Sequence, residues 1–145
     1  MNNPLIYIIK KEVKNVAKWK IEKLFKELNE ENFRLIINFR KSLYWNKLKD
    51  ETVYTYSKDV QRFLMFLQNK NITIQDATLE ILEEYIDSIE AKAQRKLKVI
   101  SSINIFYKYL RKKRLVRKNI VEDFDTKPLR TQFKIDEYVK KDGER

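Results

Sequence analysis

The chain of 145 residues is long enough for one domain, and it contains neither cysteine nor histidine. It therefore lacks a disulfide framework, a thiolate metal site, and the residue that most often serves as general base or metal ligand. It carries 32 basic and 21 acidic residues, a net charge of +11, which favours an acidic partner: nucleic acid first, an anionic membrane surface second. One glycine and two prolines leave little material for tight turns, so we expect an all-α fold.

Residues 4–28 are predicted to form an N-terminal amphipathic helix. Five apolar residues recur there at helical spacing: Ile9, Val13, Val16, Leu24 and Leu28. Lysines fill many of the other positions. Such a helix could pack on the domain, pack on a partner chain, or lie on a membrane surface. Packing is the commoner use of an amphipathic surface helix. We therefore treat residues 1–28 as an N-terminal segment distinct from the domain in residues 29–124.

Two longer helices are predicted over residues 31–46 and 51–69. Their inward-facing stripes contain Phe33, Ile36, Ile37, Leu43 and Tyr44 in the first, and Tyr56, Val60, Phe63, Leu64 and Leu67 in the second. Asp50 is predicted to cap the second helix, because its carboxylate can accept from free backbone N–H groups. Trp45 lies at the end of the first helix. We expect its ring to be buried in the core or at its edge, since that is commoner than stacking on a nucleobase.

Charge is distributed unevenly in the second half of the chain. Residues 72–90 hold six acidic residues and no basic one, and Thr78 is expected to cap a short helix within them. The basic segment, residues 91–118, holds eleven of the basic residues and no acidic one, so the whole charge excess lies in it. Its apolar residues predict a long helix with one apolar side: Leu97, Ile100, Ile103, Tyr107 and Leu110. Ion pairs with the acidic segment could cancel about half of this charge, at ~0–1 kcal/mol for each surface pair.

The residues after the basic segment are expected to fold back onto the core through Leu115, Val116, Ile120, Val121 and Phe124. Residues 125–145 are predicted to be a C-terminal linker or tail. Pro128 disfavours helix just before it, and residues 133–141 could form a last short helix. No run of about 18 apolar residues and no signal-peptide pattern occurs, so we expect a cytoplasmic protein without a membrane partner.

No motif of a catalytic or cofactor site is present. Gly143 alone cannot make a phosphate-cradling loop, and a chain without cysteine and histidine has no nucleophile–base pair of the usual kind. The carboxylates of Asp59, Glu83, Glu84 and Asp87 occupy positions expected on solvated helix faces. We therefore expect no catalysis by this chain and no cofactor or metal.

Four short patterns follow one another in a characteristic order. The first two are Lys49, Thr52, Tyr56, Asp59, Val60, Phe63, Phe66 and Leu67, then Ile74, Thr78, Leu79 and Tyr85. The last two are Lys98, Ile100, Ser101, Ile103, Phe106, Tyr107, Tyr109 and Leu110, then Arg114, Val116, Asn119 and Ile120. In order and spacing, residues 31–128 resemble the core-binding domain of the tyrosine recombinases (phage integrases). That domain is SAM-like and helical, and it precedes the catalytic domain.

The chain departs from the family pattern at three positions. Lys49 stands where the family has Ser, Arg114 where it has Gly, and Ile120 where it has Pro. We therefore expect the basic helix to run longer at its C-terminal end. The family's catalytic Arg, Lys, His-x-x-Arg box and nucleophilic Tyr have no match in this chain. The chain is expected to be a fragment of a recombinase or a stand-alone derivative.

The resemblance implies a SAM-like bundle of four core helices, an extra N-terminal helix, and a role in DNA recombination and integration. In the family this domain is one jaw of a clamp around double-stranded DNA, and other recombinase protomers on the same DNA are further candidate partners. The expected DNA-binding residues, most of them on phosphates, are Lys49, Thr52, Thr55 and Lys58 on one helix and Lys92, Arg95, Lys96, Lys98 and Ser102 on another.

Two alternatives remain open. One is a stand-alone helical DNA-binding or regulatory protein that occupies sites without cutting them. The other is a membrane- or protein-binding helical module that uses residues 4–28. A longer reading frame with His-x-x-Arg and Tyr would favour the recombinase over the first alternative, and liposome sedimentation without residues 4–28 would test the second.

Overall fold

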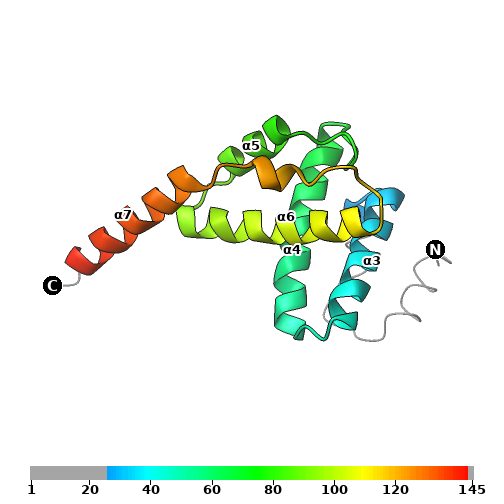
Figure 1. Cartoon of the computed structure of the whole chain (residues 1–145), viewed down its shortest axis with the longest axis horizontal. Helices are drawn as coiled ribbons and strands as arrows, with labels where there is room; N and C mark the ends of the chain where they lie inside the picture. The colour runs from blue at the N-terminus through cyan, green and yellow to red at the C-terminus, as the bar shows by residue number, and fades with distance from the viewer. Residues whose placement is uncertain (1–25, 144–145) are drawn as a thin grey trace. The chain divides into compact units, whose positions relative to one another are not determined.

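A computed structural model of the chain describes residues 26–143, and every regular element in that range is a helix. The expected all-α fold is confirmed for these residues. The elements are α3 (Glu30–Trp45), α4 (Asp50–Asn69), α5 (Leu79–Ser88), α6 (Ala93–Lys112), the short 3-10 helix η1 (Ile120–Asp123) and α7 (Lys127–Gly143) (Figure 1). They fall into two compact units, one ending at Thr73 and one beginning at Ile74. Most of the helix predicted over residues 4–28 lies outside the described residues.

The first unit is an antiparallel pair of helices, α3 and α4 (Figure 1). α3 begins where the Asn29 side chain accepts a hydrogen bond from the Asn32 N–H, at 2.9 Å. The end of α4 is tied to this start, because the Gln68 side chain accepts from the Asn29 N–H at 2.7 Å and donates to the Glu27 carbonyl at 3.0 Å. The predicted stripes are buried at Phe33, Ile36, Ile37, Leu43, Val60, Phe63, Leu64 and Leu67, and half-buried at Tyr44 and Tyr56.

Three predictions for this unit are wrong. The residue that caps α4 is Lys49, and Asp50 is the first helical residue, where its charge faces the positive end of the helix dipole. Asp59 is 1% exposed, because the buried side of α4 is wider than the apolar stripe. Trp45 is 86% exposed. Its position two residues after Leu43 puts it about 200° around the helix from the buried side.

A charged side chain lies inside the first unit. Arg40 is 1% exposed, and burial lowers the pKa of its guanidinium to about 9, against the opposing effect of a hydrogen bond with Tyr44. The group therefore remains charged at pH 7. A buried charge loses its hydration, and its protein contacts often fail to offset that loss. Its position, four residues after Ile36 and three before Leu43, lies on the predicted apolar stripe, so helical periodicity places this arginine on the buried side although its residue type favours the surface.

Replacement of Arg40 by methionine is expected to raise the free energy of unfolding by about 1 kcal/mol, since the substitution keeps most of the volume and removes the buried charge. Arg40→Ala leaves a cavity and should lower the free energy of unfolding by about 2 kcal/mol. Urea denaturation measures both. Equal losses in the two variants would show instead that the charged group stabilises the fold.

The second unit is arranged around α6. η1 contacts both α5 and α6, and α7 contacts α6 (Figure 1). α5 begins at Thr78, whose hydroxyl accepts from the Ile81 N–H at 3.3 Å, which confirms the predicted cap. The hydroxyl of Tyr107 donates to the Ile74 carbonyl at 3.3 Å and so ties α6 to the segment before α5. The predicted apolar side of α6 is buried at Ile100, Ile103, Tyr107 and Leu110, and half-buried at Leu97.

The chain after α6 folds back through a buried asparagine. Asn119 donates from its side chain to the Asn104 side chain at 2.7 Å, and its side-chain oxygen accepts from the Val121 N–H at 3.0 Å, which starts η1. Ile120 and Val121 are buried, as predicted, whereas Leu115 is exposed.

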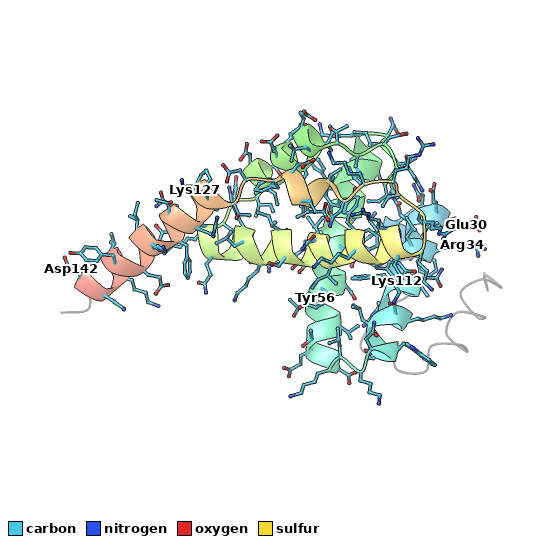
Figure 2. The ribbon with its side chains drawn as sticks, in the orientation of Figure 1. Glu30, Arg34, Tyr56, Lys112, Lys127 and Asp142 are labelled. Atoms are coloured by element: carbon cyan, nitrogen blue, oxygen red, sulfur yellow. The ribbon has the colours of Figure 1, made fainter. Side chains whose placement is uncertain are left out.

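α7 is longer than the predicted helix over residues 133–141. It begins where the Asp125 side chain accepts from the Lys127 N–H at 2.9 Å. Pro128 falls in its first turn, where the missing N–H costs no helical hydrogen bond. Lys127 and Asp142 lie near its two ends (Figure 2). Its exposed apolar residues are Ile135, Tyr138 and Val139.

Three helices end in the same way although the chain has a single glycine. α3, α4 and α6 are each followed by a residue with positive φ: Lys47 (63°), Asn71 (57°) and Arg114 (60°). After α6, the Arg114 N–H donates to the Arg111 carbonyl at 3.0 Å and the Leu115 N–H to the Leu110 carbonyl at 2.9 Å; the ends of α3 and α4 repeat this pattern. These are Schellman motifs, whose left-handed position usually holds glycine.

This geometry corrects the expectation that α6 runs on because Arg114 replaces a family glycine. α6 ends at Lys112, and Arg114 itself adopts the left-handed conformation. The two hydrogen bonds of the motif stop the helix. The steric cost of a side chain at such a position is about 1 kcal/mol or more.

Lys47→Gly and Arg114→Gly are each expected to raise the free energy of unfolding by about 0.5–1 kcal/mol, because glycine removes the steric cost of positive φ. Asn71→Gly should gain less, since asparagine tolerates this region. Thermal unfolding measures the three. Lys113→Gly is the matched control: Lys113 has φ −83°, so glycine there should destabilise. Losses at positions 47 and 114 equal to the loss at 113 would contradict the assigned geometry.

Candidate nucleic-acid interface

Four predicted DNA-binding residues belong to the start of α4 in the first unit: Lys49, Thr52, Thr55 and Lys58. Lys49 and Thr55 are exposed, and the other two are half-buried. The Thr55 hydroxyl donates to the Glu51 carbonyl at 3.0 Å, so its oxygen can still accept. The Lys58 ammonium lies 6.0 Å from the centre of the Tyr54 ring, at the outer limit of a cation–π contact.

The first turn of α4 is unfavourable for a phosphate. Asp50 and Glu51 are both exposed there, and their charges oppose a second anion at the free backbone N–H groups. The positive charges that could contact an anion from α4 therefore flank this turn, Lys49 on one side and Lys58 on the other.

The start of α6 in the second unit has the opposite character. Its first turn contains no acidic residue, and the cap residue Lys92 makes no side-chain cap hydrogen bond. Lys92 and Lys98 are exposed, and Arg95 and Lys96 are half-buried. Four cationic residues thus lie in the cap and the first two turns of α6, with Lys92 and Arg95 at the positive end of the helix dipole. This arrangement is unfavourable for the helix alone and favourable for bound phosphate oxygens.

Ser102 does not lie on the exposed side of α6, where the sequence analysis places it. It is 1% exposed, and its hydroxyl donates to the Lys98 carbonyl at 3.2 Å. The reason is that the buried side of α6 is broader than the predicted stripe and includes a second row one helical position away, formed by Val99, Ser102 and Phe106.

Two cations at the far end of the basic segment are paired with η1. Arg111 lies 3.3 Å from a carboxylate oxygen of Glu122, and Lys118 pairs with Asp123, which raises the pKa of Lys118. Both pairs are solvent-exposed, so they contribute little stability. These partners follow the basic segment in the chain and lie outside residues 72–90, the acidic segment that the sequence suggests as a source of partners. η1 thus neutralises charge at the end of the basic segment.

The second unit also contains a cavity of about 660 Å³ between the start of α5 and the chain that follows α6. Its lining mixes apolar and basic side chains such as Leu115, Arg114 and Arg117. Its acidic lining residues are Glu80 and Asp123, and Asp123 is paired with Lys118. Within residues 26–143, no three carboxylates are grouped so that they could hold a metal ion. The helices in this range include none long and apolar enough to span a membrane.

The chain is 33% identical over 107 residues to a protein named tyrosine recombinase from Pseudothermotoga lettingae. It is similar to a tyrosine recombinase. The match covers 69% of this chain and 37% of the relative, so the chain spans little more than a third of the relative's length. No family model and no solved structure matches. The similarity supports the family that the four ordered patterns resemble.

Two exposed residues near the start of α4 are absent from the predicted set. Trp45 is the last residue of α3, and Lys47 lies in the connection between α3 and α4. The position of Trp45 opposite Leu43 on the helix is a sequence signal that would have placed it outside the core. The positive φ of Lys47 has no comparable signal, since a lysine rarely occupies that region.

Proposed function

We propose that the chain is the core-binding, SAM-like domain of a tyrosine recombinase and grips the double-stranded DNA of a recombination site. The observation that carries the proposal is the start of α6, where four cationic residues, a helix dipole and an acid-free first turn coincide. The similarity to a tyrosine recombinase supports it independently.

Binding in this proposal comes mainly from the DNA backbone. Each lysine or arginine that neutralises a phosphate releases condensed counterions, which gives an affinity that falls steeply with salt. Lys92, Arg95, Lys96 and Lys98 supply such charges on α6, and Lys49 and Lys58 flank the first turn of α4. The hydroxyls of Thr52 and Thr55 add neutral hydrogen bonds that fix the register on the duplex.

Strand exchange belongs, in the same proposal, to a longer recombinase. The catalytic Arg, Lys, His-x-x-Arg box and Tyr of the family are assigned in this proposal to a separate catalytic domain, which is consistent with a match that covers 37% of the relative. The contribution of this domain is to hold the recombination site, together with other recombinase protomers on the same DNA. It takes no part in making or breaking the phosphodiester bond.

Combined replacement of Lys92, Arg95, Lys96 and Lys98 by alanine is expected to weaken binding to a duplex at least tenfold at about 0.1 M salt. The slope of log K against log salt should fall by about 3–4, since each phosphate contact contributes about 0.9. Fluorescence anisotropy of a labelled duplex over a salt series gives both values.

The matched control removes the same number of charges from α7, at the exposed residues Arg130, Lys134, Lys140 and Lys141. Its slope should stay within about one unit of that of the parent chain. Equal effects of the two quadruple variants would show that binding follows net charge and not the start of α6. A parent slope near zero would contradict DNA binding.

Ser102→Ala should leave the affinity for duplex DNA within about twofold of the parent, because the buried hydroxyl is bonded to a backbone carbonyl. Lys98→Ala should weaken it about threefold or more, since one phosphate contact is lost. The same anisotropy assay compares the two. A loss for Ser102→Ala as large as that for Lys98→Ala, with unchanged thermal stability, would show that Ser102 reaches the DNA.

A further inference from the structure

The turn between α3 and α4 presents a tryptophan to solvent. Trp45 is 86% exposed, the highest value among the large apolar side chains of the described residues. Tryptophan is strongly buried on average, and a free indole leaves up to about 200 Å² of surface in water. An indole also carries one N–H donor, so it suits a surface that offers both an apolar face and an acceptor.

Hydrogen bonds fix the turn that carries this ring. The Lys47 N–H donates to the Tyr44 carbonyl at 2.9 Å, and the Leu48 N–H donates to the Leu43 carbonyl at 3.2 Å. The Asn46 side chain adds a bond to the Ser42 carbonyl at 3.0 Å. Trp45 therefore stands on a defined helix end, so that little backbone freedom is lost when the ring meets a partner.

The residues beside Trp45 define the chemistry of that partner. Lys47 and Lys49 are exposed, and their Cα atoms lie at most about 8 and 15 Å from that of Trp45 along the chain. Lys47 adopts positive φ, which glycine would adopt more easily, and so keeps a cation at this turn. An apolar protein surface would leave both charges unsatisfied. A sugar–phosphate backbone has apolar sugar faces, acceptor oxygens and negative charge together.

We propose that Trp45 contacts duplex DNA directly, with the turn formed by Trp45, Lys47 and Lys49 lying on the sugar–phosphate backbone. The indole packs against deoxyribose and its N–H donates to a phosphate oxygen, while the two lysines neutralise neighbouring phosphates. The exposed Asp50 and Glu51 limit this contact on the α4 side. The inference rests on the proposed function and extends its DNA contact to an aromatic residue.

The chain itself provides the probe, because it contains two tryptophans, Trp19 and Trp45. In a Trp19→Phe variant, Trp45 is the single indole. Saturating duplex DNA is expected to reduce acrylamide quenching of its fluorescence at least twofold, with the same midpoint as the anisotropy of a labelled duplex. Unchanged quenching at full saturation of the DNA would overturn the inference and leave the proposed function standing.

Affinity provides a second readout. Trp45→Ala should weaken duplex binding about fivefold to tenfold, and Trp45→Phe should recover part of the loss. The salt slope should not change, because no charge is removed. The matched control is Tyr138→Ala on α7, where the aromatic ring is 71% exposed and the affinity should stay the same.

These measurements distinguish failure of the contact at Trp45 from failure of the proposed function. Equal affinities of Trp45→Ala and the parent chain overturn the contact at Trp45. Equal losses for Trp45→Ala and Tyr138→Ala also overturn it, since they would reflect exposed aromatic surface in general. Absence of duplex binding by the parent chain overturns the proposed function together with this inference. Because Trp45 is exposed, thermal unfolding of Trp45→Ala should match the parent and so exclude misfolding as the cause.

Discussion

The second unit depends on a helix, α6, that gathers positive charge near its own positive end. The cations of Lys92, Lys96 and Lys98 lie toward the positive end of the α6 dipole, and the first turn of the helix holds no acidic residue. The helix is held nevertheless, because its other side is buried and Tyr107 bonds the chain before α5. The packing of the buried side of α6 thus offsets the electrostatic cost of the positive charge at its start. A bound polyanion would relieve it directly.

Helix ends also fix the positions of charged side chains. α3 and α6 stop in Schellman motifs at Lys47 and Arg114, so each helix has a fixed last turn without a glycine. The side chains at these positions add positive charge next to a helix end. In α3 the same motif also fixes the position of Trp45. A chain that used glycine here would form the same turns at lower cost and would present less charge to a nucleic acid.

Helical periodicity predicts most of this fold. The apolar repeats that include Phe33, Val60 and Ile103 predict α3, α4 and α6, because a helical repeat of apolar residues reflects the burial of their side chains. The prediction of burial from periodicity fails where the buried side is wider than the apolar stripe, as at Asp59 and Ser102. Polar side chains are buried there, and the Ser102 hydroxyl is hydrogen-bonded to a backbone carbonyl. Residue type alone misplaces Trp45, because tryptophan is usually buried. Helical geometry puts this residue opposite Leu43 and therefore outside the core. The uneven distribution of charge places the whole excess in residues 91–118, but it does not single out the start of α6, where four of the eleven cations lie.

The central claim is that the start of α6 binds the phosphates of duplex DNA. The most direct measurement is a titration of the isotope-labelled chain with a duplex, followed by amide NMR shifts. Phosphate binding there predicts the largest shifts at the backbone N–H groups of Ala93 and Gln94, in the first turn of the helix, and small shifts along α7. Binding that leaves these two amides unmoved, or that moves α7 most, would contradict the claim.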